Sequence, residues 1–340
     1  MILRNNRKVA SDCVPYIVAE MNSSHRGKIE IAKQMIDEAK KCGCDAVKFQ
    51  SWSAESLYCK DYYDANPMSK RMVKGFALSP DSLLELSKYC KEIDIDFSST
   101  PYSNDEVDFL VDQCDAPFVK IASMDINNIP FLKYIAQKRV PIVLSTGMAT
   151  IDEIKQAVKT IEDAGNSNIC ILHCVSLYPV DAKDVNLNNM ITIKQMFPSH
   201  DYGYSDHTIG SEVACAAVGL GASLIEKHFT LNNEKIGWDN QMATEPAEMK
   251  ELVDKCHNVF NSLGSYDRNV SEDEIEQQVK MRRSIVAACD MKKGHVIQEG
   301  DITGKRPGDG IPVSEFVNII GKTVKNDILQ DQMIHTSDIE

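Results

Sequence analysis

Short apolar segments alternate with segments of helical period along most of the chain, and this alternation constrains the fold more than any other feature. Eight of them have the length and the β-branched character of covered strands. The predicted strands are YIVAE (16–20), AVKFQ (46–50), IDFSST (95–100), FVKIAS (118–123), PIVLST (141–146), ICILHC (169–174), DYGYSD (201–206) and LIEKHF (224–229). Helical period lies between most of them, at 28–42, 79–92, 150–165 and 245–264. This order predicts an α/β fold, a (β/α)8 TIM barrel.

The character of the sequence changes after residue 264. Residues 265–281 are polar and charged, which is typical of a linker with some helix. Residues 282–340 contain short β-like runs broken by Gly and Asp, which predict a small, mostly-β C-terminal domain. We therefore expect a barrel at 1–264, a linker at 265–281 and a small domain at 282–340. The last of these is short for a core of its own, so we expect it to dock on another surface.

Charge and cysteine content restrict the partners and the compartment. The formal net charge of −13 argues against nucleic acid as a partner. No apolar run is long enough for a membrane span and the first 20 residues do not resemble a signal peptide, so we expect a cytoplasmic protein without membrane contact. Eleven scattered cysteines suit reduced thiols. Cys42 and Cys44 are the only close pair, and packing at a helix end is favoured over zinc binding because no second pair accompanies them.

Polar or ionisable residues end nearly every predicted strand. They are Glu20, Lys48, Gln50, Ser99, Thr100, Lys120, Ser123, Ser145, Thr146, His173, Ser205, Asp206, His207, Glu226 and His228. The C-terminal ends of barrel strands converge at one mouth, where the active sites of such barrels lie. Any one of these residues could be a satisfied core residue, but burying many charges is costly unless they are paired or used. Together they favour a functional site. Alternation along a strand also places Lys48 with Gln50 on one face, and Glu226 with His228.

One subset of these residues suits an anion. Lys48 and Lys120 could bind a phosphate or carboxylate through charge-assisted hydrogen bonds. The hydroxyls that could assist them belong to Thr100, Ser123, Ser145 and Ser205. The alternative is that both lysines reach outward to surface carboxylates.

Two further subsets suit a metal and a sugar. His207, Glu226 and His228 could hold a divalent ion such as Mn²⁺ or Mg²⁺, or the histidines could be structural. Glu20, Asp125 and Asp239 could bind sugar hydroxyls or transfer protons. Asp125 and Asp239 lie in predicted loops, where a solvated turn residue is the alternative.

The chain resembles the sialic acid (N-acetylneuraminate) synthase family over nearly its whole length. The resemblance rests on AE (19–20), HRG (25–27), DAVKFQ (45–50), FSSTPYS (97–103), KIAS (120–123), LSTGM (144–148), HCVSLYP (173–179), YSDHT (204–208) and EKHF (226–229). In the tail, RRSIVAA, KKG and KRPGDGI resemble the family's SAF, or antifreeze-like, domain. Motifs that match in this order along the chain are highly specific.

The resemblance implies a transferase that condenses phosphoenolpyruvate with the open-chain aldehyde of an N-acetylated hexosamine. The products would be a nine-carbon 2-keto acid, that is a nonulosonic acid, and phosphate. The resemblance assigns phosphoenolpyruvate binding to Lys48, Gln50, Thr100, Lys120, Ser123, Ser145 and Ser205. It assigns the sugar side to Glu20, Asp125, Tyr178 and Asp239, with Glu20, Asp125 and Glu226 as the catalytic carboxylates.

The resemblance also implies a divalent metal and a dimer. The metal, Mn²⁺ with Mg²⁺ or Co²⁺ as alternatives, would be held by His207 and His228, with Glu226 acting on a water. In the family, an arginine of the tail reaches the active site of the partner subunit, and Arg306 in KRPGDGI matches it. We therefore expect a domain-swapped homodimer, which would also explain where the tail docks.

Several positions depart from the family pattern, mostly on the sugar side. The family's NHNG is Ser24, His25, Arg26 and Gly27 here, its Asn before IYP is Ser176, a Glu is Asp125, and a His is Asn240. The acceptor is therefore left open between N-acetylmannosamine and a modified 2,4-diacetamido hexose, as in legionaminic- or pseudaminic-type precursors.

Two other functions fit the residues. A Schiff-base aldolase or lyase of the sialic-acid pathway could use Lys48 or Lys120 as its nucleophile. A non-catalytic carbohydrate-binding protein could use the tail as an interaction module, although such a protein has no need for a row of lysines, hydroxyls and histidines at strand ends.

Overall fold

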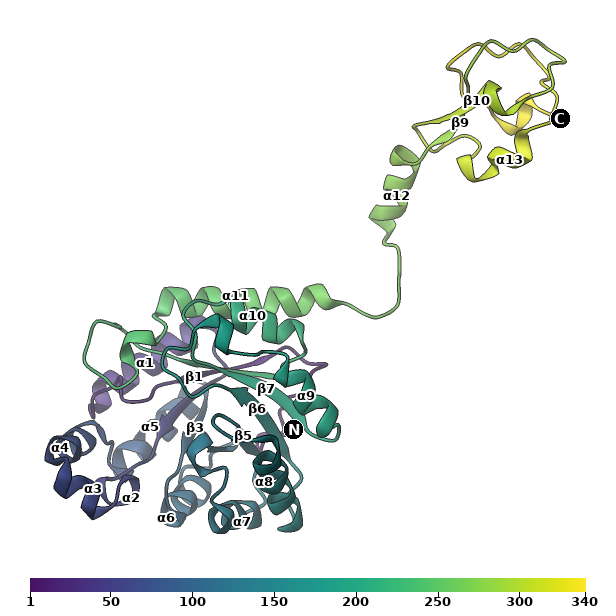
Figure 1. The fold of residues 1–340 in the computed structure, drawn as a ribbon. Coiled ribbons are helices and arrows are strands. Elements are labelled where there is room, and N and C mark those ends of the chain that lie inside the picture. The colour runs from purple at the N-terminus through teal and green to yellow at the C-terminus, as the bar shows by residue number, and fades with distance from the viewer. The chain divides into compact units, whose positions relative to one another are not determined.

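Eight parallel strands form the central sheet of a computed structural model that describes all 340 residues (Figure 1). The strands are β1 (Tyr16–Glu20), β2 (Ala46–Gln50), β3 (Asp96–Thr100), β4 (Val119–Ile121), β5 (Ile142–Ser145), β6 (Ile169–Cys174), β7 (Asp201–Asp206) and β8 (Leu224–His228). Their order around the sheet is β3-β2-β1-β8-β7-β6-β5-β4. Strands covered on both faces read as nearly continuous apolar runs, which is why the sequence reveals them so clearly.

The barrel is nearly closed, with one seam between β3 and β4. Each of the other neighbouring pairs forms a parallel ladder. Across the seam, the Ser98 hydroxyl donates to the Phe118 carbonyl oxygen at 2.9 Å. The predicted (β/α)8 barrel is confirmed. Four strands, β3, β4, β5 and β8, are shorter than predicted. The largest difference is at β4, which ends at Ile121 because Ser123 begins a 3₁₀ turn that runs to Asp125.

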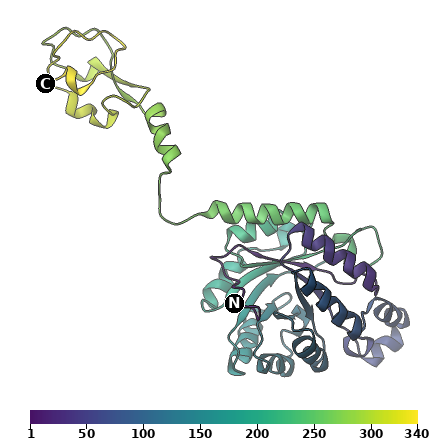
Figure 2. The same cartoon turned by 180° about the vertical axis from the view of Figure 1, so that it is seen from behind.

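One helix follows each strand on the outside of the barrel (Figure 1). These helices are α1 (Ile29–Cys42), α5 (Pro80–Glu92), α6 (Asn104–Asp108), α7 (Ile129–Gln137), α8 (Ile151–Asp163), α9 (Asn189–Met196), α10 (Glu212–Gly219) and α11 (Pro246–Leu263). The predicted helices agree with α1, α5, α8 and α11 to within one or two residues. Local signals explain that agreement: Thr150 and Glu153 form a capping box, and Pro80 and Pro246 occupy first turns. The view from behind shows α11 lying against α1 (Figure 2).

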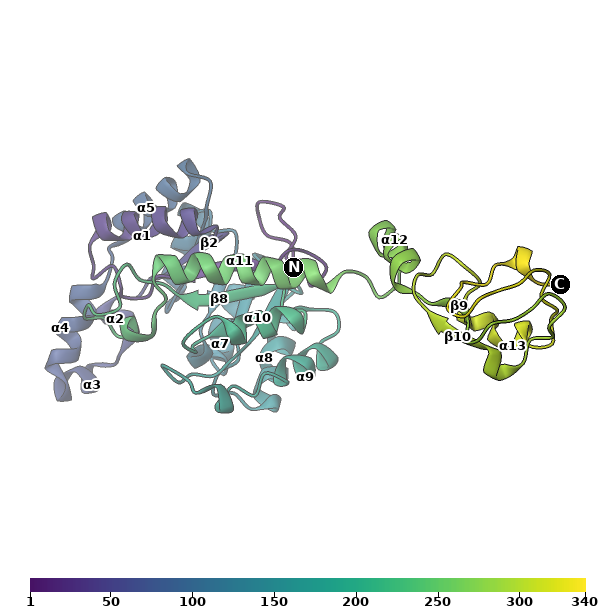
Figure 3. The same cartoon turned by 90° about the horizontal axis from the view of Figure 1, so that it is seen from above.

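Three short helices between β2 and α5 were not predicted from the sequence. They are α2 (Ala54–Leu57), α3 (Lys60–Ala65) and α4 (Pro67–Phe76), and they group at one edge of the barrel (Figure 3). Each is too short for a clear helical period, which explains the omission. Buried Trp52, Ala54, Tyr63 and Val73 form a small apolar cluster that holds this insert in place.

The N-terminal segment closes the barrel at the amino ends of the strands. Ile2 and Lys8 form an antiparallel bridge, and Leu3 and Val9 pack into the barrel interior. The interior layer that they meet comprises Tyr16, Val18, Ala46, Phe118, Val143, Cys170, Leu172 and Leu224. The amino group of Met1 pairs with Asp201. The interior is therefore a packed core and not a channel.

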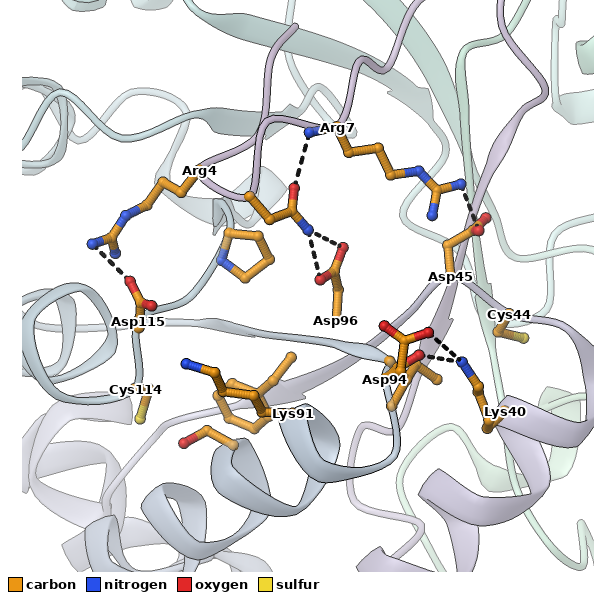
Figure 4. A pocket seen from close by; sticks show the side chains of 15 residues that line it. Arg4, Arg7, Lys40, Cys44, Asp45, Lys91, Asp94, Asp96, Cys114 and Asp115 are labelled. Carbon is orange, nitrogen blue, oxygen red and sulfur yellow. Dashed lines mark hydrogen bonds and ion pairs between the residues drawn. The ribbon is translucent and has the colours of Figure 1, made fainter.

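A cavity of about 650 Å³ lies beside this closed end (Figure 4). Its charged residues form pairs: Arg4 with Asp115 at 2.9 Å, Arg7 with Asp45 at 2.6 Å, and Lys40 with Asp94. The fourth acidic residue, Asp96, accepts hydrogen bonds from the Asn5 amide and from the Tyr16 hydroxyl. Of the four cationic side chains, Lys91 alone has no acidic partner.

The chain divides into two units, Met1–Gly264 and Ser265–Glu340. The second unit begins with α12 (Glu272–Met281), whose first turn is capped by the Ser271 hydroxyl. It continues with the antiparallel strands β9 (Ser284–Ala287) and β10 (Ile302–Lys305) and the short helix α13 (Phe316–Ile319). Its own core comprises Ile285, Ala287, Met291, Ile297, Ile302, Ile311, Ile319, Val324, Ile328, Ile334 and Ile339.

Candidate active site

A cavity of about 380 Å³ opens at the carboxyl ends of the barrel strands. It is lined by most of the residues that the sequence predicts for a site: Glu20, Lys48, Gln50, Thr100, Lys120, Ser123, Ser145, Tyr178, Ser205, His207, Glu226, His228 and Asp239. Strand register brings several of them together, because Glu20 is level with Lys48 on β2 and with His228 on β8. Residues far apart along the chain thus share one chamber.

Two lysines and two carboxylates form a buried charge network at the base of the cavity. The Lys48 ammonium pairs with Glu20 and lies 3.7 Å from Glu226, and the Lys120 ammonium lies 3.3 Å from Glu226. All four side chains are at most 5% exposed. The lysines therefore point into the barrel, and the alternative of outward-reaching lysines is wrong. Burying such a network is justified only if the charges are paired or are needed for function.

The network shifts the pKa values of the two carboxyl groups in opposite directions. Burial raises the pKa of Glu20 despite the neighbouring Lys48 ammonium. Burial also acts on Glu226, but the Lys120 and Lys48 ammonium groups and the Ser205 hydroxyl outweigh it and lower the pKa of Glu226. Burial lowers the pKa of Lys120. The pKa values of the two carboxyl groups in the same chamber are therefore shifted in opposite directions.

Hydroxyl groups line the cavity next to the lysines. Lys48 donates to the Thr100 hydroxyl at 3.1 Å, and the Ser205 hydroxyl donates to Glu226 at 3.0 Å. The Ser123 hydroxyl accepts from the Gly147 N–H at 3.0 Å. The hydroxyls of Ser145 and Ser176 are buried without any partner in the protein. Buried hydroxyls normally have partners, so these two are available to a ligand.

Gly147 makes this arrangement of hydroxyls possible. A Cβ at this position would lie 2.2 Å from the Ser176 hydroxyl oxygen, 2.8 Å from that of Ser123 and 2.9 Å from the Cys174 sulfur. No other residue fits without displacing these side chains.

Two neutral imidazoles face the same cavity. The rings of His207 and His228 have centroids 5.3 Å apart and planes inclined by 73°. Burial lowers the pKa of both, and for His228 the neighbouring His207 lowers it further. Nδ1 of His207 lies 2.7 Å from the Val175 carbonyl oxygen, so Nδ1 carries the proton and the lone pair is on Nε2, 3.5 Å from the Ser205 hydroxyl oxygen.

A metal site with three or more protein ligands is absent from the chain. The neutral state of both histidines, and for His207 the fixed tautomer, are nevertheless those of metal ligands. This donor set fits a divalent ion whose shell is completed by water and substrate.

Of the residues predicted for the sugar side, Tyr178 and Asp239 line the cavity, whereas Asp125 and Arg306 do not. Tyr178 packs against His207 with ring centroids 4.3 Å apart, and Asp239 accepts a hydrogen bond from Asn22. Burial raises the pKa of Asp239. Asp125 does not line the cavity: it accepts from the Asn128 amide at 3.1 Å. Arg306 belongs to the second unit, where it is exposed just after β10.

Four polar residues at strand ends do not line the cavity and bond within the protein instead. Thr146 donates to the Leu172 carbonyl oxygen at 2.9 Å. His173 Nε2 bonds to the Val185 carbonyl oxygen at 2.7 Å, and Ser99 bonds to the Ser51 hydroxyl. Asp206 pairs with Lys227 at 2.7 Å, and both side chains are fully buried on the outer side of the barrel wall. These four residues are satisfied core residues, the alternative that the sequence left open for any single one of them, because each has a partner in the protein.

Several cavity residues were not predicted from the sequence. They are Asn22, Trp52, Leu57, Tyr58, Tyr102, Ala122, Met124, Met148, Cys174 and Trp238, while Ser176 was known only as a departure from the family pattern. Most lie beyond the strand ends, where no periodicity marks a residue as facing inward. The position of Trp52 two residues after β2 was the one available signal.

The model of the NeuB family matches residues 35–268, more than half of the chain. The chain belongs to the NeuB family. A SAF domain matches residues 282–340 of this NeuB family member. The resemblance to the sialic acid synthases is thereby confirmed.

Several relatives of this NeuB family member are named as synthases. N,N'-diacetyllegionaminic acid synthase of Legionella pneumophila is 36% identical, over 93% of this chain and 94% of its own. N-acetylneuraminate-9-phosphate synthase of Homo sapiens is 33% identical, over 94% of this chain and 91% of its own. The structure of the N-acetylneuraminic acid (sialic acid) synthetase of Leptospira borgpetersenii, in complex with citrate, is 31% identical with a TM-score of 0.75, covering 81% and 94% of the two chains. This NeuB family member is therefore an enzyme, and none of its helices is both long and apolar enough to cross a membrane.

Proposed function

We propose that the enzyme condenses phosphoenolpyruvate with an N-acetylated hexosamine to give a nonulosonic acid and phosphate. One observation carries the proposal: two buried ammonium groups and two neutral imidazoles surround a single cavity at the mouth of the barrel. The first pair suits a small, highly charged anion and the second suits a Lewis-acidic ion. The named relatives support the same reaction class, because they are synthases of nonulosonic acids.

Phosphoenolpyruvate would bind among the lysines and the hydroxyls. Lys48 and Lys120 provide positive charge at the base of the cavity, and Ser145 and Ser176 have hydroxyls without protein partners. Both lysines are held by carboxylates in the free enzyme, so an incoming phosphate would share or replace those contacts. Donors that are placed before the substrate arrives stabilise charge on the leaving phosphate without reorganisation.

The two carboxylates suit opposite proton transfers. C3 of the enol attacks the aldehyde carbon and leaves an alkoxide that takes up a proton, and Glu20, whose pKa is raised, is better suited than Glu226 to deliver it. The cationic carbon C2 then takes up water, whose proton Glu226 can accept because it is ionised. The C–O bond to phosphate breaks last, while Lys48 and Lys120 hold the phosphate.

His207 and His228 would hold the divalent ion, Mn²⁺ or else Mg²⁺ or Co²⁺. When bound, the ion polarises the aldehyde as a Lewis acid. Titrating metal-free protein with Mn²⁺ in a calorimeter tests the site directly. Binding should be lost in His207→Ala and His228→Ala and kept in the control His335→Ala, whose histidine is exposed in the second unit. Equal binding by all four proteins would contradict the assignment.

Arg306 would complete the acceptor site of a partner subunit, in a domain-swapped homodimer. Arg306→Ala should raise the KM for the sugar and leave that for phosphoenolpyruvate unchanged. Mixing this variant with Lys120→Met gives mixed dimers in which one site keeps both residues, so activity should reappear up to about a quarter of normal. Mixtures that show only the sum of the separate activities would contradict a shared site.

Release of phosphate that requires both substrates tests the reaction itself. A binding protein would release none.

A Schiff-base aldolase is the second candidate, and one observation favours it: burial lowers the pKa of Lys120, as is typical of lysine nucleophiles. Borohydride reduction in the presence of a keto acid would trap such an intermediate as a mass increase on the protein, whereas the condensation leaves the mass unchanged.

A further inference from the structure

One ion pair is buried in the wall of the barrel, outside the cavity. The Lys227 ammonium lies 2.7 Å from the Asp206 carboxylate, and both side chains are 0% exposed. The outward side chains of the strands are otherwise mostly apolar and pack against the helices; they include Ile17, Ala19, Val47, Phe49, Ile142, Leu144 and Ile225. An apolar pair of similar volume is often at least as stable in such a layer, so packing alone does not explain the two charges.

The pair is the last rung between β7 and β8, and each of its members directly precedes a histidine of the cavity. Asp206 is level with Lys227 in the parallel ladder, and the next residues are His207 and His228. Side chains alternate across a strand, so the two charges face outward while the two imidazoles face the cavity. The ladders that join β7 to β6 and to β8 both end before His207. The position of His207 therefore depends on contacts other than strand pairing.

Thr208 provides such contacts on the far side of His207. The Lys227 ammonium donates to the Thr208 carbonyl oxygen at 2.6 Å. Asp206 Oδ1 accepts from the Thr208 N–H at 2.9 Å and from the Thr208 hydroxyl at 2.8 Å. Asp206, Lys227 and Thr208 thus form a clamp that joins the residue before His207 to the residue after it. The clamp ties both of them to the residue before His228.

The two charges give this clamp its direction. Asp206 Oδ2 accepts from Lys227, and Asp206 Oδ1 also accepts from the Tyr204 hydroxyl at 3.2 Å. An apolar pair could fill the same space, but it would offer neither a donor nor an acceptor to the backbone of Thr208. What the charges add is therefore a fixed backbone path around His207.

We infer that the clamp of Asp206, Lys227 and Thr208 positions His207 against His228 so that both imidazoles can bind one divalent ion. The inference rests on the proposed function, which assigns the ion to these two histidines. The Val175 carbonyl oxygen, 2.7 Å from Nδ1, orients the ring of His207, and the clamp fixes the backbone that carries the ring. Loss of outer contacts of this kind typically weakens metal binding by about tenfold to a hundredfold.

Calorimetric titration of metal-free protein with Mn²⁺ tests the clamp in a double variant. Asp206→Leu combined with Lys227→Met replaces both charges with apolar side chains and leaves the net charge unchanged. The metal-free double variant should unfold at nearly the temperature of the original protein, because an apolar pair can replace a buried ion pair. We expect its Kd for Mn²⁺ to rise about tenfold to a hundredfold. Since the net charge is the same, weaker binding reports a change of geometry and not a lost attraction.

Two variants at Thr208 change the clamp without removing either charge. Thr208→Val keeps the shape but removes the hydroxyl that donates to Asp206, so the Kd for Mn²⁺ should rise about threefold to tenfold. Thr208→Ser keeps the hydroxyl and is the matched control, with an unchanged Kd. These two variants decide the question if the double variant does not fold.

The outcomes separate this inference from the proposed function. A folded double variant that binds Mn²⁺ as tightly as the original protein overturns the clamp and leaves the proposed function intact, even if its unfolding temperature is lower. If the double variant does not fold, equal binding by Thr208→Val and Thr208→Ser has the same meaning. An original protein that binds no Mn²⁺ contradicts the assignment of the ion to His207 and His228, and the inference with it.

Discussion

Both ends of the barrel contain cationic side chains and carboxylates, but these charges are exposed to water at one end and buried at the other. At the amino end, three cations contact acidic partners directly at positions open to water, as for Arg4 with Asp115, whose side chains are 34% and 71% exposed (Figure 4). At the carboxyl end, Lys48, Lys120, Glu20 and Glu226 are withdrawn from water. An exposed ion pair stabilises the fold by only about 0 to 1 kcal/mol, whereas burying a charge costs several kcal/mol before it is paired.

The difference shows which end is shaped for stability and which for chemistry. The cavity at the amino end has most of its charges satisfied within the protein. In the cavity at the carboxyl end, the buried hydroxyls of Ser145 and Ser176 lack partners in the protein. A fold tolerates such incompletely satisfied groups only where a ligand completes them. Changes at the two ends should therefore separate activity from stability.

Lys120→Met should have the largest effect on activity. It removes a buried cation at the base of the catalytic cavity, so kcat should fall by about a thousandfold, as when a fixed electrostatic stabiliser is lost. Phosphate release measures this, and circular dichroism checks that the barrel remains. The control is Lys91→Met in the cavity at the amino end, a lysine that has no acidic partner. Equal loss in both variants would remove the functional distinction between the two ends.

Gly147→Ala should have the next largest effect. The added methyl group would come within 2.2 Å of the Ser176 hydroxyl and 2.8 Å of that of Ser123, so the hydroxyls must move. We expect the KM for phosphoenolpyruvate to rise at least about tenfold, because misplaced contacts of this size cost that much. Gly75→Ala is the control, since a Cβ there meets nothing within 4 Å. Normal kinetics in Gly147→Ala would mean that these hydroxyls do not bind the substrate.

Sequence reasoning reached the barrel and the base of its cavity because both rest on periodicity. Alternation along β8 placed Glu226 and His228 on one face, and both line the cavity. The same reasoning could not exclude His173 or Asp206 from the site. The sequence of a strand end does not show whether the side chain has a partner elsewhere in the protein, such as Lys227 on the outer side of the barrel wall. Trp238 could not be predicted for another reason. It lies in a loop after β8, and its contact with Trp52 depends on tertiary packing.

A buried histidine close to the catalytic end should make stability depend on pH. Burial lowers the pKa of His25 to about 4, and its Nδ1 accepts the Gly27 N–H at 3.1 Å. At pH values between the ordinary histidine pKa near 6.5 and the folded-state pKa of about 4, His25 binds a proton in the unfolded chain but not in the folded protein. The free energy of unfolding therefore falls as the pH falls through this window. The slope from this group is about 1.4 kcal/mol per pH unit.

Urea unfolding at pH 7 and pH 5 measures this slope. In His25→Gln, which cannot titrate, the difference in unfolding free energy between the two pH values should shrink by the contribution of one group. The exposed His335→Gln serves as the control and should leave the difference unchanged. An undiminished pH dependence in His25→Gln would show that other groups cause it.

Arg7→Ala at the amino end should have the smallest effect. Its guanidinium lies 2.6 Å from Asp45 and 4.6 Å from the centre of the Tyr16 ring, but the side chain is 40% exposed. An exposed ion pair and a cation–π contact together stabilise by about 1 kcal/mol. Asp45 keeps the hydrogen bond from the Ile17 N–H, so no buried charge is left alone. Thermal unfolding should therefore shift by only a few degrees, and kcat and KM should not change. A kinetic effect from this position would mean that the two ends of the barrel are coupled.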